Sequence, residues 1–396
     1  MASTKTVAEQ RNYHVLTVED ARRIATVWLE NIGLERAVTF GLPEIDDRYH
    51  VWRVPLLGTN GQGRLGEVVI DARTSLIFED KTTAKAVLEQ RLLKQGGTKK
   101  KRRPRNRRYK LSALRNTIAC GDAEEILQQL PAESVDLIFT SPPYYNARPE
   151  YTEYITYEEY LLKIRKVIQS CHRVLNEGRF FVMNVSPILI RRASRSESSR
   201  RIAVPFDMHR LFVEEGFDFI DDIIWVKPEG AGWATGRGRR FAADRNPLQY
   251  KPVPVTEYVL VYRKHTDRLI DWNIRAHPRQ DLVRASKIAD GYETTNVWRI
   301  KPAHDKKHPA VFPEELATKV ISYYSFVGDV VLDPFAGVGT VGQAAVKLGR
   351  RFVLIEINPE YAQEICRRAR KWLGKEAAQD IFLINCPPIR VDDMLL

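Results

Sequence analysis

The chain has 396 residues, of which 44% are hydrophobic and 28% are charged, and its formal net charge is +12. The length allows two or three domains with hydrophobic cores, and the composition is typical of a globular protein. No apolar run reaches the ~18 residues that suggest a membrane span, and the polar residues 1–12 do not form a signal peptide, so we expect a cytoplasmic protein.

Residues 1–95 are predicted to form a small α+β accessory domain. Thr17 caps an expected helix that ends near Ile32, before Gly33, and a second helix is expected over residues 82–94. Between the two helices, short alternating segments predict an antiparallel meander at residues 37–40, 49–56 and 66–70. The segments 52–54 and 66–74 are distantly similar to the PepSY-like fold.

A basic linker follows at residues 96–110. Its segment 99–110 carries nine positive charges and no acid, which leaves +3 for the rest of the chain. A run of like charges does not fold alone and is typical of an arm that contacts nucleic acid. A solvated linker that only aids solubility is the alternative.

Residues 111–375 alternate between strand and helix patterns, and the first chemical signal is a polar turn after an apolar strand. The strand at residues 135–139 ends in Ser141-Pro142-Pro143-Tyr144. The prolines cannot continue a strand ladder, so the chain leaves the sheet in a stiff, extended conformation. The turn presents a hydroxyl, free carbonyls and a flat ring, which suit a planar ring that carries an amino group.

The second signal is a glycine turn between a strand and a helix. An apolar strand ends at Asp333, Gly337 and Gly339 follow it, and the next strand ends at Glu356, 19 residues after Gly337. This is a Rossmann-type layout, in which glycines allow close approach of the backbone and the second acid binds ribose hydroxyls. A carboxylate at Asp333 suits an ammonium group better than a pyrophosphate, so the pattern favours S-adenosyl-L-methionine, with Asp333 near its amine.

Together these motifs resemble those of amino-group DNA methyltransferases. Residues 141–144 match the family's catalytic motif, and residues 333–340 match its cofactor motif, Asp-Pro-Phe-x-Gly-x-Gly-Thr. The catalytic motif comes first, an order that resembles the circularly permuted β group. The resemblance implies an α/β, Rossmann-like methyltransferase domain that binds S-adenosyl-L-methionine. The cofactor residues that it implies are Asp122, His308, Pro309, Phe312, Asp333, Phe335, Gly337, Gly339, Thr340 and Glu356.

The roles of individual residues follow from the same resemblance. His308, Pro309 and Phe312 match a segment that closes over the cofactor, and Asp122 lies near the adenine, although it can also simply cap the helix that follows it. Ser141 and the Pro142 carbonyl are expected to accept hydrogen bonds from the target amine of a flipped-out base, while Tyr144 stacks on its ring.

Serine as the first motif residue resembles the cytosine-N4 subgroup, so we expect transfer to N4 of cytosine. Transfer to N6 of adenine is the closest alternative. A catalytically idle DNA-binding relative and a methyltransferase that acts on RNA or protein also remain open.

We expect double-stranded DNA to be the partner, and target recognition to lie in residues 228–252 and 264–300. Glycine and arginine mixed with aromatic residues in a long loop usually indicate function. A restriction endonuclease, if one exists, is expected to be a separate chain. The expected phosphate or guanine contacts are Arg237, Arg239, Arg240 and Arg245.

No metal site is expected. The four cysteines form no Cys-x-x-Cys pair, and prolines bracket His304 and His308, which disfavours a helical metal pair. Residues 376–396 are expected to be a C-terminal tail.

Overall fold

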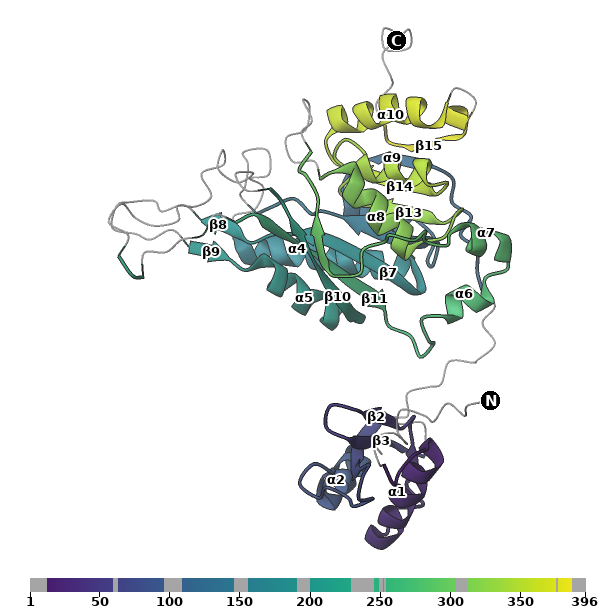
Figure 1. Ribbon diagram of the computed structural model, residues 1–396. Helices are drawn as coiled ribbons and strands as arrows, with labels where there is room; N and C mark the ends of the chain where they lie inside the picture. The colour runs from purple at the N-terminus through teal and green to yellow at the C-terminus, as the bar shows by residue number, and fades with distance from the viewer. Residues whose placement is uncertain are drawn as a thin grey trace. The chain divides into compact units, whose positions relative to one another are not determined.

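The computed structural model describes residues 13–59, 63–95, 109–145, 156–190, 200–228, 246–248, 252, 254–303, 312–374 and 377–386. The chain divides into two compact units, Met1–Arg107 and Arg108–Leu396 (Figure 1).

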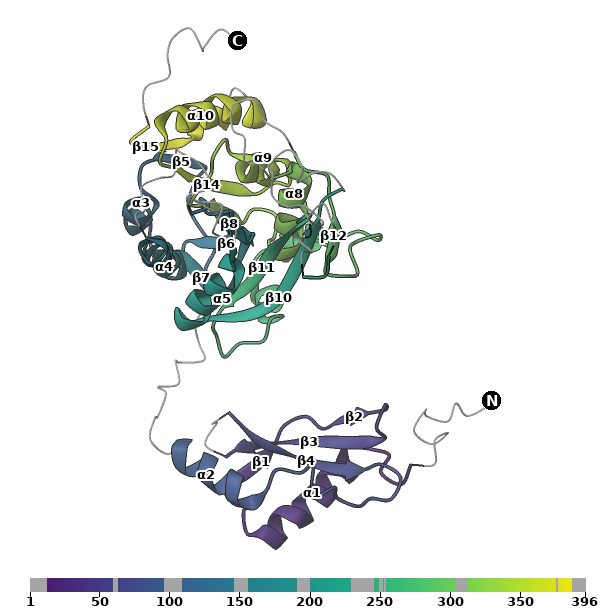
Figure 2. The ribbon, with the colours of Figure 1, turned by 90° about the vertical axis from the view of Figure 1, so that its left-hand side faces the viewer.

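In the first unit, strand β3 (Val51–Gly58) pairs antiparallel with β1 (Val38–Phe40), β2 (Glu44–Asp46) and β4 (Arg64–Asp71) (Figure 2). Helix α1 (Val18–Ile32) begins with the expected capping box between Thr17 and Asp20. Helix α2 (Lys85–Gln95) starts later than expected, because Thr82 accepts a hydrogen bond from the Val69 amide of β4. Both helices and the sheet share one hydrophobic cluster, so this unit has its own core.

In the described part of the second unit, nine strands form one sheet in the order β12-β10-β11-β7-β6-β13-β14-β5-β15. Strands β7, β6, β13, β14, β5 and β15 run parallel, β11 runs antiparallel to β7 and β10, and β10 pairs parallel with β12. The strands are β5 (Thr117–Cys120), β6 (Val135–Thr140), β7 (Leu175–Val185), β10 (Phe217–Val226), β11 (Thr256–Lys264), β12 (Val297–Arg299), β13 (Val330–Asp333), β14 (Arg351–Glu356) and β15 (Phe382–Ile384).

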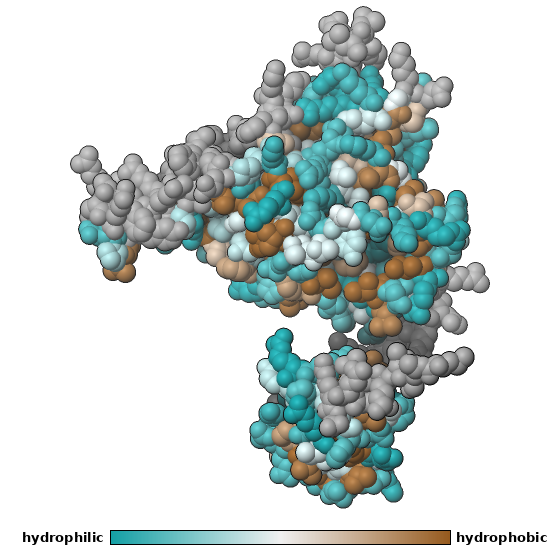
Figure 3. Space-filling view, in the orientation of Figure 1, coloured by the Kyte–Doolittle hydropathy of each residue, from teal (hydrophilic) through white to brown (hydrophobic). Residues whose placement is uncertain are grey.

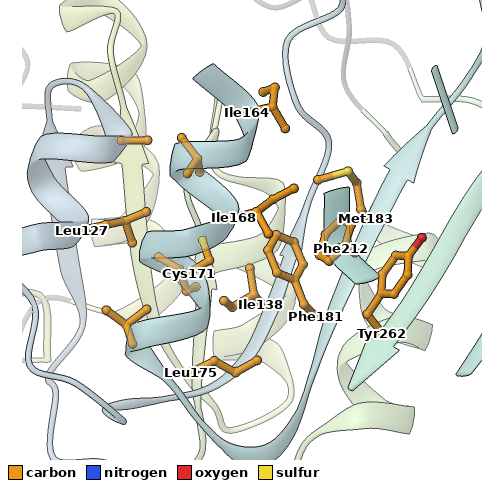
Figure 4. Close-up of a cluster of buried hydrophobic side chains, with 14 of the residues drawn as sticks. Leu127, Ile138, Ile164, Ile168, Cys171, Leu175, Phe181, Met183, Phe212 and Tyr262 are labelled. Atoms are coloured by element: carbon orange, nitrogen blue, oxygen red, sulfur yellow. The ribbon is translucent and has the colours of Figure 1, made fainter. Parts of the chain in front are cut away.

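Helices cover both faces of this sheet. Figure 4 shows part of one hydrophobic cluster, in which Ile168 and Cys171 of α4 face Ile138 of β6 and Phe181 of β7. The other cluster joins the opposite face of the same strands to α8, α9 and α10. From Leu137 to Phe139 the side chains of β6 alternate between the clusters, as expected for a strand buried on both faces. The first layer contains α3 (Ala123–Gln129), α4 (Tyr157–Val174) and α5 (Val204–Glu214), and the second contains α8 (Glu314–Tyr324), α9 (Thr340–Lys347) and α10 (Pro359–Leu373).

The neighbouring strands β6 and β13 form a topological switch point. After β6 the chain crosses through α4 to β7 on one side, and after β13 it crosses through α9 to β14 on the other. In open α/β sheets, ligands bind beyond the carboxyl ends of the strands at such a point. The α/β Rossmann-like fold predicted from the sequence is confirmed.

Shorter elements complete the unit. Strands β8 (Ile188–Ile190) and β9 (Arg200–Ile202) pair with each other, and β12 lies within the segment expected to recognise the target. The segment expected only as a tail contains a 3₁₀ turn (Ala377–Asp380) and β15, which pairs with β5. Helices α6 (Trp272–Ala276) and α7 (Gln280–Ala285) connect β11 to β12.

The surface seen in Figure 3 mixes hydrophobic and hydrophilic side chains over the described residues of each unit. None of the helices that the structure describes is long and apolar enough to cross a membrane.

Candidate active site at the carboxyl edge of the sheet

A buried hydrogen bond joins the two sequence motifs. Strands β6 and β13 are paired in register through Ile138 and Leu332, so both end at the same edge of the sheet. There the Thr140 hydroxyl donates to Oδ1 of Asp333 over 2.6 Å, between residues 193 positions apart in the sequence. The same Oδ1 accepts the Phe335 amide over 3.0 Å. The catalytic and cofactor motifs therefore start side by side.

Asp333 is electrostatically unusual. Burial raises the pKa of its carboxyl group to about 7, although the hydrogen bonds from Thr140 and Phe335 oppose this rise and the nearby Glu356 adds to it. A buried carboxylate is stabilised by a cation that binds beside it. The geometry is compatible with the ammonium partner expected from the sequence.

The glycine turn lies between Asp333 and Glu356. Gly337 and Gly339 have φ angles of +56° and +87°, and a Cβ on Gly339 would meet Trp372 at 2.8 Å. Glu356 closes this turn, because its Oε2 accepts the Gly337 amide over 2.7 Å and its Oε1 accepts the Asn358 amide over 2.9 Å. Burial raises the pKa of Glu356, while these amides lower it. Thr340 then begins α9, and Phe335 is half-buried.

Asp122 lies after β5, the strand next to β14, and it caps α3. One carboxylate oxygen accepts the Glu124 amide over 2.8 Å, and the other accepts from the Lys163 ammonium over 2.6 Å. The capping role weighed from the sequence is confirmed, and a contact with the adenine stays a prediction.

The catalytic motif extends from β6 with Pro142 buried and Ser141, Pro143 and Tyr144 half-buried. The Tyr144 hydroxyl donates to Oε2 of Glu257 over 3.3 Å. This carboxylate also accepts from Asn184 over 2.8 Å and from the Lys227 ammonium.

Sequence reasoning missed Thr140, Asn184, Lys227 and Glu257. The signals available were a threonine at the end of the motif strand and an acid directly before residues 258–262 of β11, which are apolar or aromatic. Neither signal identifies the partner of the residue, because the partners come from distant segments of the chain.

Other predicted site residues are only partly described. The ring of Phe312 packs against that of Phe139 on β6, with 5.0 Å between their centroids. Phe312 therefore lies on the face of the sheet that α8, α9 and α10 cover. Among the residues that the structure describes, no three His, Cys, Asp or Glu side chains are grouped to hold a metal. His308, Pro309, Arg237, Arg239, Arg240 and Arg245 lie outside the described residues.

Comparisons with known proteins agree with this geometry. Residues 135–367 match the family model of the DNA methylases, N6_N4_Mtase. The DNA adenine methyltransferase YhdJ of Escherichia coli K12 is 30% identical over 262 residues, which are 64% of this chain and 82% of YhdJ. The Type II beta methyltransferase M.BslI of a Bacillus species is 28% identical over 61% of this chain, but the match spans only 26% of M.BslI.

A solved structure shows the same fold. The chain resembles TTHA0409, a putative DNA modification methylase from Thermus thermophilus in complex with S-adenosyl-L-methionine. The TM-score is 0.55 and the identity 27%, over 69% of this chain and 99% of the other. Since the family model covers more than half of the chain and includes both motif strands, this protein belongs to the N6_N4_Mtase family of DNA methylases.

Proposed function

We propose that this protein transfers a methyl group from S-adenosyl-L-methionine to N4 of cytosine in double-stranded DNA. The observation that supports the proposal is the hydrogen bond between Thr140, directly before residues 141–144, and Asp333, at the switch point of the sheet. A methyl donor and an acceptor amine bound to these motifs are thereby brought together, as group transfer requires.

S-adenosyl-L-methionine is the cofactor, and the residues at the edge of the sheet fit it. Asp333 offers a buried carboxylate for the cationic amine, and Gly337 and Gly339 adopt the positive φ angles of the turn between Asp333 and α9. We assign Glu356 to the ribose and Asp122 to the adenine side. Phe335 and Thr340 complete the loop, and Phe312, His308 and Pro309 are assigned to the segment that covers the cofactor.

The acceptor half of the site uses the catalytic motif. The exocyclic amine of a nucleobase is a poor nucleophile, because its lone pair is delocalised into the ring. Ser141 Oγ and the Pro142 carbonyl accept hydrogen bonds from this amine and hold it in line with the methyl group, while Tyr144 stacks on the flipped base. Pro143 keeps the turn extended. The bound cofactor would supply an electrophilic methyl group on a sulfonium, which leaves as the neutral thioether. The methylated amine then releases one proton to solvent, so a strong base is unnecessary.

Cytosine N4 is favoured by serine at the first position of the motif. Adenine N6 is the second candidate, because YhdJ, at 30% identity, is named an adenine methyltransferase. The same residues serve both reactions, since each acceptor is an amino group on a planar ring.

For DNA contact we assign the basic segment 99–110 and the arginines at positions 237, 239, 240 and 245, whose charges suit phosphates and guanine edges. The relative M.BslI is named a Type II methyltransferase, and we assign any partner restriction endonuclease of this protein to a separate chain.

The test is mass spectrometry of nucleosides from DNA of varied sequence, incubated with the protein and methyl-labelled S-adenosyl-L-methionine. Label in N4-methylcytosine is the expected result. Label in N6-methyladenine would keep the mechanism and replace the base, whereas no label in any nucleoside of the DNA would overturn the proposed substrate.

A further inference from the structure

Side chains from three segments of the chain contact the carboxylate of Glu257, which belongs to a fourth segment and lies beside the catalytic motif. Glu257 stands at the start of β11, and its neighbour Tyr258 pairs with Val185 at the end of β7. The adjacent Thr256 pairs with Val226 at the end of β10. This register brings Asn184, Lys227 and Tyr144, from the ends of β7, β10 and β6, to the side chain of Glu257.

The two oxygens of the Glu257 carboxylate accept hydrogen bonds from different partners. Oε1 accepts from the Lys227 ammonium, and Oε2 accepts from both the Asn184 amide and the Tyr144 hydroxyl. Lys227 also lies 4.5 Å from the centre of the Trp225 ring, which helps to hold the ammonium in place.

A purely structural role does not require this arrangement. Glu257 is 8% exposed and Asn184 is 2% exposed. Burying charged groups costs desolvation energy, and apolar side chains of similar volume often stabilise a core equally well. The acid interrupts a strand whose following residues are mostly apolar and buried. Its distinctive effect is to fix a hydrogen-bond acceptor at the hydroxyl of Tyr144.

We infer that Glu257, held by Lys227 and Asn184, is a positioning residue that fixes the ring of Tyr144 in the plane on which the target base stacks. The inference rests on the proposed function, which assigns Tyr144 to the base. The hydrogen bond anchors the far end of the ring, while the backbone after Pro143 anchors the near end. A ring held at both ends loses little entropy when a base stacks on it.

Glu257→Gln is the informative substitution. The amide of glutamine keeps one acceptor oxygen, and the Lys227 ammonium donates to it. The NH₂ group of the amide then faces Asn184 and Tyr144 and cannot accept their hydrogen bonds. We expect kcat for DNA methylation to fall about tenfold, with the affinity for S-adenosyl-L-methionine unchanged. Asp218→Asn is the matched control, because it removes a carboxylate bonded to His265 at the opposite end of the same strand pair.

A double-mutant cycle separates positioning from a general loss of structure. Tyr144→Phe removes only the hydroxyl, so Glu257→Gln in that background should lower kcat by less than about twofold further. Independent, multiplicative effects of the two substitutions would overturn the inference, as would unchanged kcat in Glu257→Gln or an equal loss of cofactor affinity.

Fluorine NMR of protein labelled with 3-fluorotyrosine tests the positioning without any methylation assay. The resonance that disappears in Tyr144→Phe belongs to Tyr144, and it should shift or broaden in Glu257→Gln but not in Asp218→Asn. An unchanged resonance would overturn the inference even in an active enzyme. If the Tyr144 resonance shifts in Glu257→Gln but the wild-type protein methylates no DNA, the proposed function is overturned instead. If Glu257→Gln does not fold, Glu257→Met with Lys227→Met leaves neither an acceptor for Tyr144 nor an unpaired ammonium, and it permits the same measurements.

Discussion

At the scale of single residues, Asp333 is the buried acid that we assign to the amine of the cofactor. Its carboxyl group has a pKa raised to about 7 by desolvation, and both of its described hydrogen bonds reach the same oxygen. Burial and the nearby Glu356 disfavour the charged form of Asp333. A cation bound beside the carboxylate would favour the charged form and lower its pKa. We therefore propose that Asp333 couples its protonation to cofactor binding.

We predict that the affinity for S-adenosyl-L-methionine falls as the pH is lowered from 8 to 6, because the amine binds the carboxylate form of Asp333. Binding near pH 7 should release a fraction of a proton, which calorimetry in buffers of different ionisation enthalpy measures. Thr140→Val removes a bond that lowers the pKa, so the midpoint should move to higher pH. A pH-independent affinity in the wild type, or an Asp333→Asn variant with unchanged affinity, would contradict this role.

The sequence predicts Asp333, Gly337, Gly339 and Glu356 as cofactor residues because they follow one another at a fixed spacing over two neighbouring strands and the glycine turn between them. Thr140 and Glu257 were not identified. Their partners, Asp333 and Tyr144, lie 193 and 113 residues away, and only the strand order of the sheet brings them together. Local periodicity contains no information about such pairs.

At the scale of elements, the turn before α9 depends on the absence of a side chain at Gly339. Its φ is +87°, and an added Cβ would approach the Trp372 ring of α10 at 2.8 Å. At the other end of α9, Gly349 has a φ of +72°, but a Cβ there would meet Val327 at 3.4 Å. The two positions share backbone strain and differ in the space around them.

Gly349→Ala is expected to lower the free energy of unfolding by about 1 kcal/mol, through the left-handed backbone alone. Gly339→Ala should lower it by roughly 2 kcal/mol or more, because the clash adds to the strain. Urea denaturation of both variants measures the difference. Equal losses would show that α10 moves freely to admit the methyl group.

Element prediction succeeded where amphipathic patterns were long, as in α1, which begins after its predicted cap Thr17 and ends at Ile32 as expected. It missed β12 and β15, which have three residues each and are defined by parallel pairing with distant strands. Segments of three residues are too short to show a repeating hydrophobic pattern. Only their pairing in the tertiary structure therefore assigns them to the sheet.

At the scale of the whole molecule, two compact units are joined through a basic segment. The described part of the second unit begins at Tyr109, whose ring stacks on Trp272 and contacts His277. We propose that residues 1–95 are an accessory domain and that the charges before Tyr109 bind DNA phosphates.

Removal of residues 1–108 deletes eight positive charges of the segment 99–110 and should leave cofactor binding unchanged. DNA affinity should fall, and the slope of log K against log salt should become less negative by ~0.9 for each phosphate that the shortened protein no longer binds. Removal of residues 1–95 alone keeps the arm and serves as the control. The same slope in both truncated proteins would show that the arm does not bind phosphates.

The central claim is that methyl transfer occurs where β6 and β13 end together. Its most direct test measures labelled methyl transfer to DNA by the wild type, Ser141→Ala and Tyr144→Ala, alongside the binding of S-adenosyl-L-methionine by each. We predict that the wild type labels DNA and that both variants bind the cofactor normally but transfer no methyl group. Full activity of Ser141→Ala or Tyr144→Ala would contradict the claim.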